Sequence, residues 1–122
     1  MTKVKVNLLI DHSPLDRNGI WGDFAVTTKM VKEMLENNKF NETPYFGNTA
    51  GQHAKRIAYF IKNGWKDSIT LMVGIPEMRD CLPYIGDGYH RLAAAILRND
   101  EYIDVGIDGS LKYAEDLFGV KF

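Results

Sequence analysis

The feature that most constrains the fold is the run from residue 54 to residue 73, where a helical pattern, a stop and a strand pattern follow one another. An apolar helix face is predicted by residues at helical spacing, namely Ala54, Ile57, Ala58 and Ile61. Asn63-Gly64 predicts the helix end, because glycine tolerates the left-handed conformation that ends helices. Ile69–Val73 then predicts a strand, which Gly74 and Pro76 interrupt. A chain that changes from helix to strand over so short a distance has to pack helices against a sheet.

The same alternation extends along the rest of the chain. Further strands are predicted over 4–8, over a short segment ending at Tyr84-Ile85, and over 102–107. Further helices are predicted from Thr27 or Thr28 to Leu35, around 92–96 and over 111–118, with Gly119 ending the last. We therefore expect a single α+β domain over residues 1–122, compact, with a small mixed sheet flanked by helices.

The charge balance limits the partners that the whole surface can attract. The chain has 15 basic and 16 acidic side chains, for a formal net charge of −1. A near-neutral surface has no general attraction for nucleic acid or anionic membrane, although a local basic patch stays open. DNA is therefore a less favoured partner than a small molecule, and we expect no membrane partner.

Compartment signals favour the cytoplasm. Cys81 is the single cysteine, so an intramolecular disulfide is excluded, which fits a reducing environment. The apolar run near the N-terminus is short for a signal peptide, and no stretch approaches the roughly 18 apolar residues of a membrane span.

Two polar segments and several single residues are weaker functional candidates. The pattern of residues 11–24 predicts a loop with a structural role. That of residues 41–52 predicts a second, polar and turn-rich connecting loop. His53, Lys55 and Arg56 are expected on a solvated helix face, with a phosphate contact as the alternative for Arg56. Candidates for base stacking or core filling are Trp21, Trp65, Tyr84 and Tyr89. The three histidines and one cysteine lack the spacing of a zinc site.

The stretch from residue 86 to residue 91 is the strongest candidate site. It places Gly86, Asp87, Gly88, Tyr89, His90 and Arg91 between a strand and a helix. The first N–H groups of a helix are unpaired and attract anions, above all phosphate. Glycines allow close approach of a ligand, Arg91 offers a bidentate fork and His90 a further donor.

Asp87 has several open roles in such a corner. A carboxylate repels a phosphate, so it fits better as a helix cap, a metal ligand or a base that accepts a substrate proton. The structural alternative is that Asp87 caps the helix, Gly88 makes a turn, and His90 and Arg91 are solvated.

Two segments resemble the ParB/sulfiredoxin-like superfamily. "IGDGYHRLAAAILRNDEYIDVGI" is similar to its strand, Gly-x-(His/Arg)-Arg turn, alanine-containing helix and following strand. "RIAYFIKNGWKDSITLMV" resembles its preceding helix, glycine and strand, so that the likeness covers residues 52 to about 107. Tyr89 stands where sulfiredoxins carry their reactive cysteine, which argues against sulfinic acid reduction. The chain also lacks the helix-turn-helix and dimerisation regions of ParB.

The nearest local motif is the Asp-Gly-His-His-Arg turn of the free serine kinases. Asp87, Gly88, His90 and Arg91 match it, and Tyr89 departs from it. The resemblance implies that the turn holds nucleotide phosphates, with Asp87 near metal or substrate and Mg²⁺ with ATP or CTP as cofactors. The upstream catalytic acid of that family has no clear counterpart, and Asp11, Asp16 and Asp23 remain candidates.

These observations predict a phosphate- or nucleotide-binding domain, a nucleotide-dependent phosphotransferase or nucleotide hydrolase if it turns over. The alternatives are a non-catalytic binding or regulatory module of a phage or mobile element, and a DNA-associated ParB-like protein.

Overall fold

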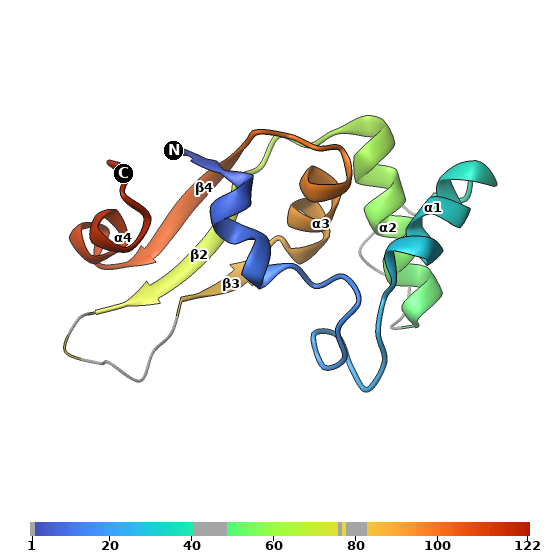
Figure 1. Ribbon diagram of the computed structural model, residues 1–122, viewed down its shortest axis with the longest axis horizontal. Coiled ribbons are helices and arrows are strands. Elements are labelled where there is room, and N and C mark those ends of the chain that lie inside the picture. Colours follow the sequence, from blue (N-terminus) through green and yellow to red (C-terminus); the bar gives the residue numbers. More distant parts are fainter. Residues whose placement is uncertain (1, 41–48, 76, 78–82) are drawn as a thin grey trace.

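A four-stranded mixed sheet forms one half of the molecule. The computed structural model describes residues 2–40, 49–75, 77 and 83–122 (Figure 1). The sheet has the order β1-β4-β2-β3, made of β1 (Thr2–Lys5), β4 (Tyr102–Gly109), β2 (Ile69–Gly74) and β3 (Tyr84–Asp87). The central strands β2 and β4 run parallel, and each edge strand pairs antiparallel with its neighbour. The predicted α+β class with a small mixed sheet is confirmed.

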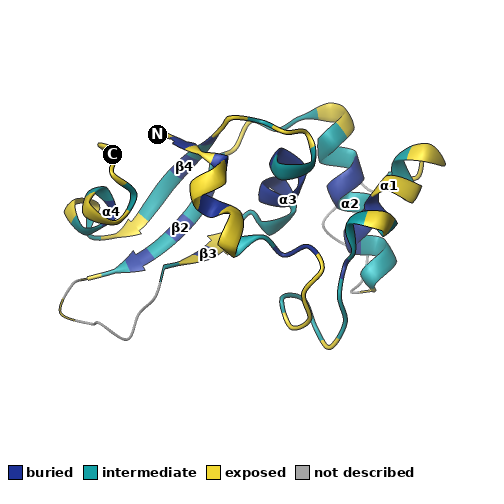
Figure 2. Ribbon diagram, viewed as in Figure 1, coloured by how far each residue is buried: buried dark blue, intermediate teal, exposed yellow. Residues whose placement is uncertain are grey.

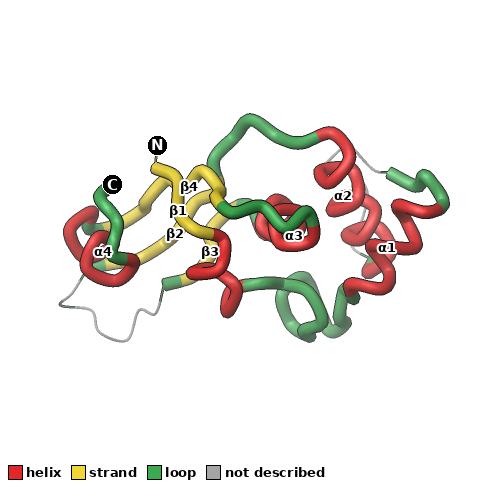
Figure 3. Tube along the Cα trace, turned by 45° about the horizontal axis from the view of Figure 1, so that its top comes forward, coloured by secondary structure: helices red, strands yellow, loops and turns green. Residues whose placement is uncertain are grey.

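Helices flank the sheet at both ends of the long axis. They are the 3₁₀ helix η1 (Val6–His12) and the α-helices α1 (Thr28–Glu36), α2 (Ala50–Asn63), α3 (Tyr89–Leu97) and α4 (Leu111–Phe118). Figure 3 shows α3 between the sheet and α2, with α1 outermost on that side and α4 beyond the sheet on the other. No helix in the described part of the chain is both long and apolar enough to cross a bilayer.

The helix α3 belongs to two hydrophobic cores. Its residues Leu92 and Ala95 pack in the core of the sheet, together with Leu71 and Val105. Ala93 and Ala94 pack in a second core, which α2 and α1 complete. All four α3 residues are fully buried, which Figure 2 shows as dark blue on the central helix. Alanine on a helix buried on two faces keeps the neighbouring elements close.

The predicted strand over residues 4–8 is too long. The strand β1 ends at Lys5, and Val6–His12 forms η1. The Val6 N–H donates to the Glu101 carbonyl at 2.9 Å, and the chain then turns. The turn brings Leu9 into the core while Leu8 stays 45% exposed, the reverse of the side-chain alternation that a strand requires.

The predicted helix ends are confirmed, and the starts are sharpened. Thr27 is the N-cap of α1, because its side chain accepts the Met30 N–H. Thr49 and Gln52 form a capping box, so α2 begins at Ala50, inside the predicted polar connection. Residues 41–48 of that connection, and most of the segment 77–83, lie outside the described residues.

Candidate functional site

Two histidines meet where α2 packs against α3. His53 lies on the inner face of α2 and is 5% exposed, so its predicted place on a solvated face is wrong. Its Nδ1 lies 2.8 Å from Nε2 of His90, and one of the two nitrogens donates the hydrogen bond according to the tautomer. The ring planes differ by 16° and the ring centroids are 5.1 Å apart, so the rings meet edge to edge in almost one plane. We call this pair of rings the imidazole platform.

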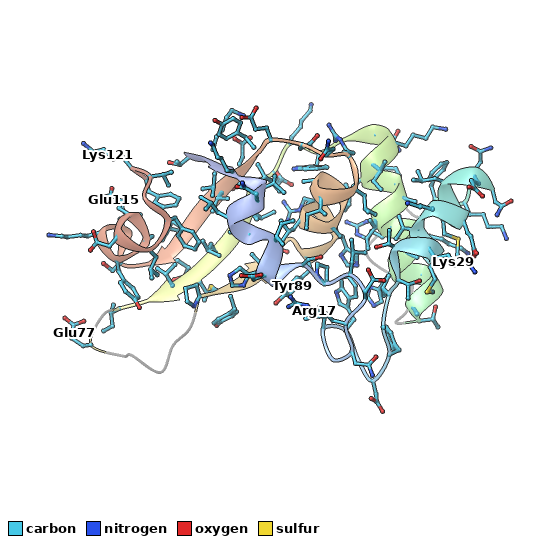
Figure 4. All side chains as sticks on the ribbon, viewed as in Figure 1. Arg17, Lys29, Glu77, Tyr89, Glu115 and Lys121 are labelled. Atoms are coloured by element: carbon cyan, nitrogen blue, oxygen red, sulfur yellow. The ribbon has the colours of Figure 1, made fainter. Side chains whose placement is uncertain are left out.

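Trp21 covers the imidazole platform from the 11–24 loop. Its indole lies 4.4 Å from the His53 ring at 10° and 4.6 Å from the His90 ring at 18°, counted between centroids and planes. It also meets Tyr89 edge-on at 6.3 Å. Figure 4 shows Tyr89 at the first turn of α3 and Arg17 on the loop that passes this end of the helix. The loop therefore has a defined position on the candidate site.

Burial and neighbouring charges keep the two histidines neutral. Burial, and next the electrostatic effects of His53, Arg56 and Arg91, together lower the pKa of His90 to about 3. Burial also lowers the pKa of His53. The pKa of Arg56 is lowered by burial and by the charge of Arg91. These four side chains, which we call the basic cluster, thus act on one another across α2 and α3.

Arg91 is anchored inside the protein. Its Nη1 donates to the carbonyls of Asp67 and Ser68 at 2.9 and 3.0 Å, and its Nη2 donates to Asp87 Oδ2 at 3.1 Å. The residue is 9% exposed, so the alternative that Arg91 is a solvated first-turn residue is wrong. The guanidinium ties α3 to the segment that enters β2.

Asp87 does not cap α3. The N-cap is Gly88, which makes no side-chain cap hydrogen bond. The Asp87 carboxylate, 76% exposed, pairs with Arg91 because it ends β3 one residue too early to reach the first-turn N–H groups. Across the described ranges, no group of three or more His, Cys, Asp or Glu side chains is placed to hold a metal ion.

The two glycines of the turn pack against β2. A Cβ on Gly86 would lie 2.7 Å from Met72 Cγ, and one on Gly88 would lie 2.5 Å from Ile69 Cγ2. Gly88 also has a φ of 109°, which side chains rarely adopt. At Gly88 the close packing and the backbone conformation are sufficient to require glycine independently of any ligand, whereas at Gly86 the flexible Met72 side chain could shift.

Asp16, one of the candidate upstream acids, has a structural role. Its carboxylate accepts hydrogen bonds from the Thr28 N–H at 3.0 Å and the Thr28 hydroxyl at 2.9 Å. It thus holds the 11–24 loop against the start of α1. Asp11 and Asp23 are exposed.

The structure brings all six residues of the predicted turn to one end of α3 and adds three more. His53 and Arg56 come from α2, and Trp21 comes from the loop. His53 had a sequence signal, because it lies four residues before Ile57 and so extends the apolar helix face. Trp21 was predicted as a candidate for base stacking or core filling, but its ring contacts with His53, Tyr89 and His90 are with residues distant in the chain and could not be predicted.

Comparison with protein-family models, curated proteins and solved structures finds no match to this chain.

Proposed function

We propose that this chain is a phosphate-binding domain of the ParB/sulfiredoxin-like kind, whose ligand lies at the first turn of α3 beside the basic cluster. The observation that carries the proposal is the meeting of the basic cluster, His53, Arg56, His90 and Arg91, at the end of α3 whose N-cap is Gly88. The first turn of α3 also has no acidic residue.

Electrostatics favour an anion at this place. Two guanidinium groups close enough to depress a pKa repel each other, and Asp87 offsets that charge from a largely solvated position. A phosphate at the first turn of α3 would be attracted by both guanidinium charges and would accept hydrogen bonds from first-turn N–H groups. The neutral histidines would contribute N–H donors and no charge.

A nucleotide is the ligand class that we favour, with Mg²⁺ carried on its phosphates. Gly86, Gly88, Tyr89, His90 and Arg91 would form the turn that holds it, and Asp87 would face the metal ion or a substrate hydroxyl. Mg²⁺ on phosphates keeps several waters and takes only one or two protein carboxylates. The exposed Asp87 fits that requirement, and within the described residues it belongs to no group of three or more potential metal ligands.

A binding module without turnover is the second candidate. The position of Trp21 favours it, because the indole covers both histidines that would otherwise be open to a reacting group. Phosphate release from ATP or CTP by the wild-type protein would identify a nucleotide hydrolase, since a pure binding module produces none. A DNA-associated role is less favoured on the near-neutral charge.

The decisive test is calorimetric titration with inorganic tripolyphosphate, and with ATP and CTP in the presence of Mg²⁺. Arg56→Gln should weaken tripolyphosphate binding about tenfold or more, because a charge-assisted hydrogen bond contributes roughly 1.5–3 kcal/mol. Lys55→Gln is the matched control, since it removes the same charge from the neighbouring position of α2 and should change affinity less than twofold. Arg91→Ala is a poor probe, because it also removes the bonds to Asp67 and Ser68. Absence of tripolyphosphate binding by the wild type would refute the proposal.

A further inference from the structure

The contact between Trp21 and the imidazole platform has the dimensions of a ligand contact. A single bicyclic ring lies over two monocyclic rings that form one nearly flat surface, at 4.4 and 4.6 Å between centroids. Stacking of this kind is how proteins bind nucleobases in a sequence-tolerant way. A purine is also a flat bicyclic ring system, of about the size of indole.

The surface under Trp21 is continuous with the proposed phosphate site. His90 is the second residue of α3, so a ring lying on the imidazole platform is beside the first-turn N–H groups. Arg56 and Arg91 act on the same His90 ring. A ligand with a ring and a phosphate could thus occupy both places at once.

Trp21 is placed on a turn and not on a helix or strand. Gly19 and Gly22 flank it with φ values of 93° and 156°, and the Gly19 N–H donates to the Gly22 carbonyl at 3.0 Å. Isolated bridges from Leu15 to Val26 and from Asn18 to Ala25 anchor the base of the turn. Trp21 is thus carried on the tip of a turn whose base is held by backbone bridges, and displacement of the indole requires a change at the tip alone.

We infer that Trp21 occupies the place of a purine base on the imidazole platform. When a purine nucleotide binds, its base displaces the indole and stacks on the two histidine rings. This inference rests on the proposed phosphate site and adds base selectivity to it. A cytosine ring covers less of the platform than a purine, so ATP should bind more tightly than CTP. When a side chain of the protein itself fills the binding surface for part of the time, the apparent affinity for the ligand is reduced.

The test compares ATP, CTP and tripolyphosphate by calorimetry on wild type and Trp21→Ala. Removing the competitor should tighten ATP binding on the order of tenfold. Tripolyphosphate affinity should change less than twofold, because it makes no ring contact. Tyr102→Ala is the control, since it removes an exposed aromatic side chain of β4. Equal ATP affinity in wild type and Trp21→Ala overturns the inference while tripolyphosphate binding still supports the phosphate site.

A second measurement covers the case in which Trp21→Ala fails to fold. Trp21 and Trp65 are the two tryptophans, so the wild-type protein gives two indole N–H signals in a ¹H–¹⁵N spectrum, assigned with Trp65→Phe. The Trp21 signal should shift on saturation with ATP by more than with tripolyphosphate, because it leaves the imidazole platform. A Trp21 signal that responds alike to both ligands contradicts displacement. Absence of tripolyphosphate binding overturns the inference together with the proposed function.

Discussion

His53 and His90 share a hydrogen bond of 2.8 Å between ring nitrogens, although 37 positions separate them in the chain. A neutral pair can share one proton in this way, whereas two imidazolium rings cannot. The bond therefore links the packing of α2 on α3 to the protonation state of the histidines.

Acidification should unfold the protein through this pair. The pKa of His90 is about 3 in the folded chain against an ordinary 6.5, so the unfolded chain binds more protons between these values and stability falls as pH drops from 6.5 toward 3. Between pH 7 and pH 5 the loss from His90 should be about 2 kcal/mol. Urea titrations at both pH values measure it.

His90→Gln supplies the contrast for this prediction. Its amide oxygen can accept from His53 Nδ1 but does not titrate, so the variant should lose much of the pH dependence. His12→Gln removes the histidine of η1 whose pKa is also lowered chiefly by burial, and it should leave the larger pH dependence from His90 in place. A pH dependence equally steep in wild type and His90→Gln would contradict the assignment.

Arg91 and Asp87 should differ sharply in their contribution to stability. Arg91→Met leaves the carbonyls of Asp67 and Ser68 without their donor and should cost about 3 kcal/mol. Asp87→Ala removes an ion pair whose carboxylate is 76% exposed, and should cost less than about 1 kcal/mol. Denaturant midpoints of the two variants decide whether the carbonyl bonds or the ion pair holds the turn.

Glycine at position 88 should be irreplaceable. A Cβ there lies 2.5 Å from Ile69 Cγ2 in a left-handed backbone, so Gly88→Ala should cost at least about 2 kcal/mol. Gly51→Ala is the matched control, since a Cβ at that position of α2 meets no atom within 4 Å. It should stabilise by about 0.5–1 kcal/mol, because alanine favours the helix. Thermal unfolding of both variants gives the comparison.

Of the two loop aspartates Asp16 and Asp23, only Asp16 should contribute to the stability of the fold. Asp16→Ala removes both bonds to Thr28 and should cost about 1 kcal/mol. Asp23→Ala should be close to neutral, because the residue is exposed. If Asp16→Ala is as stable as Asp23→Ala, the bonds to Thr28 do not anchor the loop.

Local sequence patterns predict most of the fold. Helix ends follow from short-range chemistry, as Gly64 and Gly119 show with φ values of 73° and 67°. The α+β fold class follows from the alternation of helical and strand patterns of apolar residues along the chain. The exception is the segment after Lys5, where the sequence alternates like a strand but the backbone turns to bury Leu9. At that point the Val6 N–H bonds to the Glu101 carbonyl, a long-range contact that no local pattern contains.

The candidate site is less predictable because its contacts are long-range. The local sequence predicts a ligand-binding turn from the glycines and Arg91. In the structure the glycines also pack against β2, and Arg91 donates hydrogen bonds to the carbonyls of Asp67 and Ser68. The partners that surround His90 come from a helix and a loop far upstream. Periodicity places His53 on the inner face but does not say which ring it meets.

The membership of α3 in both hydrophobic cores has a consequence for cooperativity. Opening either half of the molecule uncovers one face of this helix, so the slowest amide hydrogens of the sheet and of α2 should exchange in the same global event. A ligand that binds the first turn of α3 would then slow exchange in both halves equally, far beyond the atoms it touches.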